Sequence, residues 1–159
     1  MANTKAYAAT APDSGLAPYA IDRRELRADD VAIEIDYCGV CHSDLHTVEN
    51  DWGGSKYPVI PGHEIVGRVT AVGPEVSHFK AGDLVGVGCM VDSCRSCSAC
   101  DSGLEQYCIE GSTMPYGTPA RHDGPGTPGG YSEPTVVRQP VVSSGPDKRH
   151  RGPGRPAPG

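Results

Sequence analysis

Large apolar side chains are scarce in this chain. Phenylalanine and tryptophan each occur once and methionine occurs three times, whereas glycine occurs 21 times and proline 15 times among 159 residues. This composition favours a turn-rich, mainly β domain over a bundle of helices. A chain of this length has room for one full domain and little more.

The sequence also lacks a long apolar run and an excess of basic residues. No segment approaches the roughly 20 apolar residues of a membrane-spanning helix, and residues 1–18 do not resemble a signal peptide. Twenty acidic residues against fourteen basic ones give a net charge of −6, which indicates no nucleic-acid partner. Seven cysteines without a secretory signal indicate a reducing compartment, so we expect a cytoplasmic protein without a membrane partner.

Four of the cysteines follow the pattern C-x2-C-x2-C-x7-C: Cys94, Cys97, Cys100 and Cys108. Four thiolates at such spacing can surround one tetrahedral zinc ion and leave no position for a substrate, so the pattern predicts a structural zinc site. Disulfides or unconnected core thiols are alternatives. An iron–sulfur cluster is another, although the short step to a Cys-Pro pair that is usual in such clusters is missing.

Residues Val31–Tyr37 alternate between apolar and polar with period two, which predicts a strand with one buried face. Residues 12–18 read as a loop, and the residues around Leu45 and Val48 can form a short helix. The predicted strands are Lys5–Thr10, Val31–Tyr37, Ile65–Val72, Leu84–Val87 and Tyr131–Val137.

A second group of polar residues begins where the strand Val31–Tyr37 ends. Cys41 opens a segment with two histidines, a serine and an aspartate, and His63 and Glu64 stand directly before the next strand. A cysteine and a histidine from separate segments, with a third ligand, would form an open catalytic zinc site. Spacing alone leaves it undecided whether Cys41 and His63 bind metal. We expect the other isolated cysteines, Cys38 and Cys89, to be small core residues.

Three motifs, in this order, resemble the zinc-dependent medium-chain alcohol dehydrogenases. The segment Cys41–His46 resembles their catalytic-zinc segment, and Gly62–Val76 matches their zinc signature G-H-E-x2-G-x5-G-x2-V. The segment Gly88–Cys94, the four-cysteine pattern and Gly129–Glu133 resemble the NADP-dependent, cinnamyl-alcohol-dehydrogenase-like branch. The resemblance covers about residues 5–137. It implies a GroES-like catalytic domain over residues 1–137: a mainly β, partly open barrel with short helices and a four-cysteine zinc lobe.

The resemblance also implies the metal ligands. Cys41 and His63 would bind the catalytic zinc, and Glu64 would lie behind it. Asp44 would orient the His63 ring through its other nitrogen. The structural zinc would be held by Cys94, Cys97, Cys100 and Cys108.

Further roles follow from the same resemblance. Ser43 would take the proton of the alcohol and contact the cofactor, and His46 would pass the proton towards solvent. His42 would lie near the phosphates of the cofactor, while Trp52 and Tyr57 would line the substrate pocket. The implied activity is NADP-linked hydride transfer between primary alcohols and aldehydes, and the full-length family forms homodimers. The alternative is a zinc-binding module that keeps the fold without the chemistry.

Two parts of the family's machinery have no counterpart here. Its third catalytic ligand is a cysteine beyond the strand at Tyr131, and no cysteine follows Cys108. Its Rossmann domain, of roughly a hundred residues or more, is also missing. The G-x-G-x-x-G pattern at Gly124–Gly129 contains prolines and follows no hydrophobic strand, so we interpret it as a loop. We therefore expect little or no turnover from this chain alone.

The last residues, 138–159, are rich in proline, glycine and arginine. We expect this tail to be disordered. A nucleic-acid-binding arm is an alternative interpretation of its basic residues. A further hypothesis is that the tail is translated out of frame, which reading the gene in all three frames would test.

Overall fold

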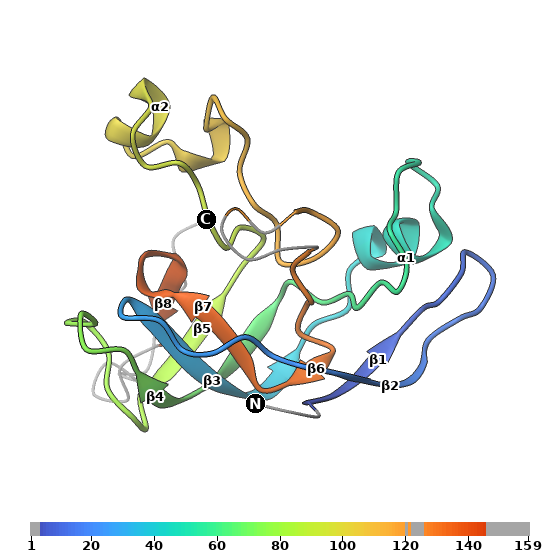
Figure 1. The fold of residues 1–159 in the computed structure, drawn as a ribbon, viewed down its shortest axis with the longest axis horizontal. Coiled ribbons are helices and arrows are strands. Elements are labelled where there is room, and N and C mark those ends of the chain that lie inside the picture. The colour runs from blue at the N-terminus through green and yellow to red at the C-terminus, as the bar shows by residue number, and fades with distance from the viewer. Residues whose placement is uncertain (1–3, 120, 122–125, 146–159) are drawn as a thin grey trace, which may run out of the picture.

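A computed structural model describes residues 4–119, 121 and 126–145, and these residues form two antiparallel sheets (Figure 1). The smaller sheet has the order β2-β1-β6, and the larger has the order β7-β3-β4-β5-β8. The helices are α1 (His42–Glu49) and α2 (Ser98–Asp101), with short 3-10 turns η1 (Glu105–Tyr107) and η2 (Gln139–Val141). The strands are β1 (Thr4–Ala8), β2 (Ala17–Ile21), β3 (Asp30–Cys38), β4 (Ile65–Val72), β5 (Leu84–Val87), β6 (Ser132–Glu133), β7 (Thr135–Arg138) and β8 (Val142–Ser144).

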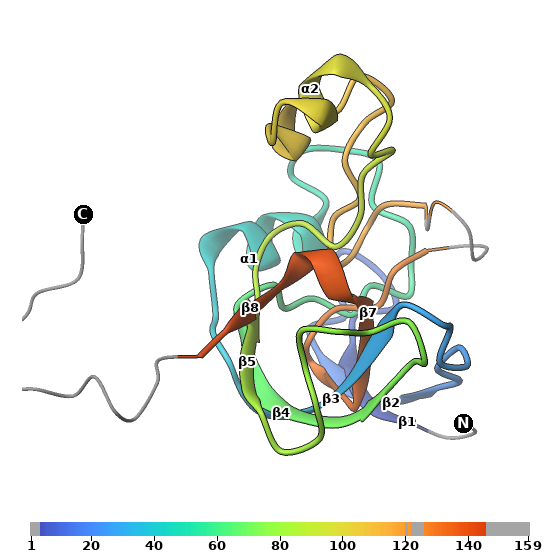
Figure 2. The same ribbon diagram turned by 90° about the vertical axis from the view of Figure 1, so that its left-hand side faces the viewer.

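The larger sheet curls into a partly open barrel. Its two edge strands, β7 and β8, are connected only by the three-residue turn η2, so the sheet must bend until its edges approach each other. Figure 2 looks along this bend, with η2 spanning from one edge to the other. Two register shifts between β3 and β4 supply part of the curvature. The expected partly open barrel is therefore confirmed.

The core of this barrel consists almost entirely of β-branched side chains. The branched residues pack well on pleated strands, which explains how a chain with a single phenylalanine fills its interior. Fully or nearly buried members of the core are Val31, Ile33, Ile65, Val69, Val85, Val87, Val137 and Val142.

Truncating Ile33 in the central strand β3 should test this core. Ile33 is fully buried, and we expect Ile33→Ala to lower the free energy of unfolding by about 2–5 kcal/mol, because it removes buried methyl groups and leaves a cavity. Urea denaturation measures the change. Glu34→Ala, on the exposed face of the same strand, should change stability by less than about 0.5 kcal/mol. Equal effects of the two variants would contradict this assignment of the core.

The smaller sheet and its junction with the larger one differ from the predicted strands. The predicted loop at residues 12–18 ends early, because Ala17 and Pro18 already belong to β2 and pair with Ala8 and Tyr7. Proline is tolerated there because β2 lies at the edge of its sheet. The predicted strand Tyr131–Val137 is split at Pro134, which has no N–H for a continuous ladder. Its halves join different sheets, β6 with β1 and β7 with β3.

Regular structure continues beyond the predicted domain boundary at residue 137. Arg138 ends β7, η2 follows, and β8 pairs with β5. Val142 of β8 is buried in the barrel core, which explains why residues 138–144, assigned to the tail from the sequence, take part in the barrel. Residues 146–159 lie outside the described residues.

All strand pairs of the described residues are antiparallel, so this part of the chain contains no parallel βαβ unit of the Rossmann type. Within the same residues, none of the helices combines the length and apolar character that crossing a membrane requires.

The four-cysteine lobe, residues 92–113, projects from the barrel at the top of Figures 1 and 2. It begins and ends at a backbone bridge between Asp92 and Thr113. Ion pairs fix its base to the barrel. Arg95 Nη2 lies 2.5 Å from Asp92 Oδ1 and Arg95 Nη1 lies 3.9 Å from Asp29 Oδ2, while Arg138 of β7 contacts both carboxylates.

Candidate active site and metal centres

The four-cysteine lobe gathers its sulfur atoms into a compact group. The Sγ atoms of Cys94, Cys97, Cys100 and Cys108 all lie within 4.8 Å of one another. Cys100 Sγ is 3.8 Å from Cys94 Sγ and 3.5 Å from Cys97 Sγ. A tetrahedron with Zn–S bonds of about 2.3 Å has S–S edges of about 3.8 Å. All seven cysteines lie among the described residues and all are free thiols, so the disulfide alternative is wrong.

Backbone N–H groups favour the thiolate form of Cys94 and Cys97, whereas the pKa of Cys100 is raised to about 11, with burial and the neighbouring Cys97 and Cys94 among the causes. The N–H of Ser96 is the largest cause that lowers the pKa of Cys94, to about 6, followed by the contact with Cys108. The pKa of Cys97 is lowered by the N–H groups of Cys100 and Ile109. The Cys94 N–H also lies 3.4 Å from Cys108 Sγ. Since metals bind the deprotonated thiol, these donors suit a metal site.

A second group combines Cys41, His63 and Glu64, whose ligand atoms also lie within 4.8 Å of one another. The sheet explains how residues this far apart in sequence meet. Cys38 at the end of β3 pairs with Ile65 at the start of β4, and the Gly39 N–H donates to the Glu64 carbonyl at 2.8 Å. The segments just beyond the paired ends are therefore neighbours.

Asp44 connects the two segments that carry this group. It is the third residue of α1 and only 2% exposed. Its Oδ2 accepts from the Cys41 N–H at 2.9 Å, and its Oδ1 accepts from the Gly62 N–H at 3.0 Å. The same Oδ1 lies 3.2 Å from His63 Nδ1. One carboxylate thus holds the backbone on both sides of the candidate metal site.

Gly62 is required next to His63 for two reasons. Its φ of 103° is one that residues with a side chain rarely adopt. A Cβ at this position would also lie 2.7 Å from Tyr131 Cδ1 and 2.8 Å from Cys38 Sγ. The glycine before the histidine therefore allows the ring to enter a closely packed site.

Among the serine and histidines of α1, Ser43 contacts this group, whereas the contacts of His46 are with Asp51 and Trp52. Ser43 Oγ donates towards Cys41 Sγ at 3.3 Å. His46 Nδ1 is 2.7 Å from Asp51 Oδ2, and its ring centroid is 5.0 Å from that of Trp52. His42 is exposed in the first turn of the helix, with its ring centroid 6.0 Å from that of His46.

A cavity of about 260 Å³ opens beside the candidate metal group, lined in part by Ser43, His63 and Trp52. Tyr57 does not line this cavity, and its place in a substrate pocket stays a prediction. The Tyr57 hydroxyl instead donates to the Val48 carbonyl at 2.5 Å. Cys89, predicted to be a core residue, is exposed and lines this cavity. Cys38 is half-buried and packs against the core.

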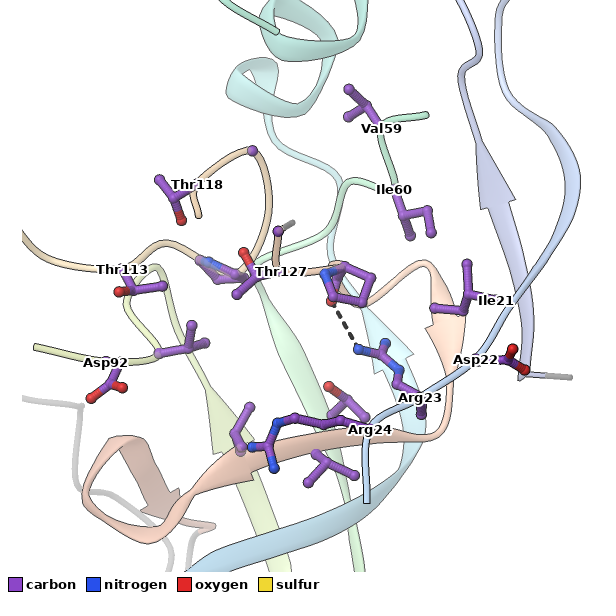
Figure 3. A pocket seen from close by; sticks show the side chains of 18 of the residues that line it. Ile21, Asp22, Arg23, Arg24, Val59, Ile60, Asp92, Thr113, Thr118 and Thr127 are labelled. Carbon is purple, nitrogen blue, oxygen red and sulfur yellow. Dashed lines mark hydrogen bonds between the residues drawn. The ribbon is translucent and has the colours of Figure 1, made fainter. Parts of the chain in front are cut away.

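A larger cavity of about 650 Å³, which Tyr57 does line, lies between β2 and β7 (Figure 3). Its wall combines apolar side chains such as Ile21 and Ile60 with several arginines. Arg23 donates to the Pro128 carbonyl at 3.1 Å, the dashed contact in Figure 3, and burial lowers its pKa to about 10. This cavity contains no member of either metal-ligand group.

Sequence reasoning missed Tyr116, which lies in the irregular segment after the four-cysteine lobe. It is 9% exposed, and its hydroxyl is 3.0 Å from His63 Nδ1. Burial, and then the hydrogen bond to Asp44, raise its pKa. A tyrosine outside any motif or periodic segment gave no signal of this contact.

Comparison with known proteins supports the resemblance stated above. The family model for the alcohol dehydrogenase GroES-like domain matches residues 27–147. NADP-dependent alcohol dehydrogenase C of Mycobacterium bovis is 50% identical over 147 residues, which are 92% of this chain and 42% of the relative. Aldehyde reductase YahK of Escherichia coli is 53% identical over 137 residues, 86% of this chain and 38% of the relative.

Solved structures give the same result. A cinnamyl alcohol dehydrogenase from Sorghum bicolor superimposes with a TM-score of 0.87 at 44% identity, over 91% of this chain and 41% of that chain. The cinnamyl alcohol dehydrogenase of Helicobacter pylori, complexed with NADP(H), gives a TM-score of 0.86 at 40% identity, over 90% of this chain and 41% of that chain. This chain thus spans about two fifths of the length of these relatives. The chain belongs to the GroES-like N-terminal domain family of the medium-chain zinc alcohol dehydrogenases, in the branch of the cinnamyl alcohol dehydrogenases and the NADP-dependent alcohol dehydrogenases C.

Proposed function

We propose that this chain is the zinc-binding, substrate-side domain of an NADP-linked alcohol dehydrogenase or aldehyde reductase. The observation that carries the proposal is the convergence of Cys41, His63 and Glu64, with ligand atoms within 4.8 Å of one another. A thiolate and an imidazole are ligands that zinc prefers, and a carboxylate is a third. The donor set and its spacing therefore fit a zinc ion. The four-thiolate group of the lobe fits a second, structural zinc ion.

A zinc ion at the first site would act as a Lewis acid on the oxygen of an alcohol or aldehyde. His63 would present Nε2 to it, because Asp44 lies against the other ring nitrogen. Ser43 lines the small cavity and would accept the proton of the alcohol. His46, three residues further along the same face of α1, would receive that proton, with Asp51 holding its Nδ1.

The cofactor and substrate are part of the same proposal. NADP is proposed because the Mycobacterium bovis and Helicobacter pylori relatives are described as NADP-dependent or bound to NADP(H). His42, exposed at the start of α1, would lie near the cofactor phosphates. Trp52 would form a wall of the substrate pocket. Homodimer formation, implied by the family resemblance, stays a prediction.

Zinc content tests the proposed catalytic site. We expect the purified chain to hold about two zinc ions and Cys41→Ser to hold about one, because removing the thiolate leaves only the lobe occupied. Cys38→Ser, which removes a nearby half-buried thiol outside the group, should retain both ions. Elemental analysis measures the content. One zinc ion in both the unmodified chain and Cys41→Ser would contradict the proposal.

The alternative function is that of a zinc-binding module without catalytic chemistry. Zinc bound at the four-thiolate lobe and at no other site would favour this alternative. Cobalt substitution separates the two functions. We expect a primary alcohol or aldehyde to perturb the visible spectrum of Co²⁺ at the Cys41–His63 site, since the proposed site has an open position. A spectrum that is unchanged by any such ligand favours the module.

A further inference from the structure

Among the described residues, Tyr116 makes the shortest polar contact to Nδ1 of the His63 ring. Its hydroxyl is 3.0 Å from His63 Nδ1, whereas Asp44 Oδ1 is 3.2 Å away. The two rings also pack, with their centroids 5.7 Å apart at an interplanar angle of 42°. His63 therefore has two polar neighbours at Nδ1, while its Nε2 lies 4.0 Å from Glu64 Oε1.

Asp44 is already occupied by other donors. Its two oxygens accept the N–H groups of Cys41 and Gly62, at 2.9 Å and 3.0 Å. A neutral imidazole with its proton on Nδ1 offers one N–H there, and a tyrosine hydroxyl can accept one hydrogen bond while it donates another. The consistent pattern is that the His63 N–H donates to the Tyr116 oxygen, while the Asp44 oxygens accept from the backbone.

We propose that Tyr116 is a positioning residue for His63, which fixes the tautomer and the rotation of the ring so that Nε2 stays free for the candidate metal group beside Glu64. Tyr116 also lines the small cavity beside Ser43 and Trp52, so one side chain links a wall of that cavity to the candidate metal ligand. The proposal rests on the proposed function only in taking a metal ion as the partner of Nε2.

The hydroxyl alone is removed by Tyr116→Phe, which keeps the ring and its packing. Partners of metal-binding histidines typically contribute about 10- to 100-fold to metal affinity. We therefore expect Tyr116→Phe to weaken Co²⁺ binding at the Cys41–His63 site by about 10-fold or more, with binding at the four-cysteine lobe unchanged. Tyr57→Phe is the matched control, because the Tyr57 hydroxyl bonds only to a backbone carbonyl in the described structure.

A second measurement does not depend on metal. In ¹⁵N NMR spectra of the purified chain, His63 should show the Nδ1–H tautomer with a slowly exchanging proton. Tyr116→Phe should accelerate that exchange and shift the Nδ1 resonance, which a purely structural side chain would not do. If both the exchange rate and the metal affinity of Tyr116→Phe stay within twofold of the unmodified chain, the proposal is wrong.

The two readouts distinguish this proposal from the proposed function. If the unmodified chain binds only one metal ion, the catalytic assignment fails, and the His63 resonances still decide whether Tyr116 holds the ring. If two ions bind with equal affinity in both chains and the resonances are unchanged, the proposed function survives and the role of Tyr116 does not.

Discussion

Replacing Cys97 by serine is expected to release one zinc ion and to unfold the four-cysteine lobe while the barrel stays folded. The lobe has little else to hold it, because its larger apolar side chains, Leu104, Tyr107 and Ile109, are exposed and belong to none of the buried clusters of the described residues. A metal that binds only the folded lobe stabilises it by about 4 kcal/mol at a free zinc concentration of 1,000 Kd. Losing one of four thiolates should remove most of this stabilisation.

Zinc analysis and hydrogen exchange measure the two effects separately. In Cys97→Ser, amide protons of residues 94–111 should exchange rapidly, while those of β3 and β4 remain protected. Cys89→Ser, which removes an exposed thiol outside both metal-ligand groups, is the control and should leave zinc content and exchange unchanged. Retention of all zinc in Cys97→Ser would show that the lobe is not a four-thiolate site. A brown iron-containing protein would favour the iron–sulfur alternative instead.

The parts of the fold that the sequence predicts well are those with a local pattern. Alternation in Val31–Tyr37 and the β-rich run Ile65–Val72 predict two strands, which lie side by side in the barrel. The cysteine spacing predicts a cluster whose sulfur atoms lie within 4.8 Å of one another. In both cases the determining residues are close in sequence, so no knowledge of the tertiary structure is needed.

The remaining features depend on contacts between distant segments. Pro18 lies in an edge strand because this strand pairs with β1. Val142 lies in β8 because that strand pairs with β5 and buries the valine in the barrel core. Tyr116 reaches His63 across 53 positions of sequence. The spacing of Cys41 and His63 alone did not decide whether they bind a metal ion. The resemblance to the alcohol dehydrogenases was needed to predict that both bind the same ion. The ladder between β3 and β4 gives that pairing its physical cause.

Removing the carboxylate of Asp44 should have the largest effect of any single change at the candidate active site. Asp44→Ala leaves the N–H groups of Cys41 and Gly62 without their acceptor in a buried site. An unpartnered buried donor costs about 1–3 kcal/mol. We therefore expect a loss of unfolding free energy on the order of 3–5 kcal/mol, together with loss of the second zinc ion, because both ligand-bearing segments lose their common anchor.

An asparagine at this position should rescue only part of the loss. Asp44→Asn keeps the shape, but it has one acceptor oxygen where the carboxylate has two, so its NH₂ group must face one of the two backbone donors. Stability should therefore fall between those of the unmodified chain and Asp44→Ala, as measured by urea denaturation. Glu49→Ala, at an exposed position of the same helix, should change stability by less than about 0.5 kcal/mol. If Asp44→Ala were as stable as Glu49→Ala and retained both zinc ions, Asp44 could not be the group that holds the Cys41 and His63 segments together.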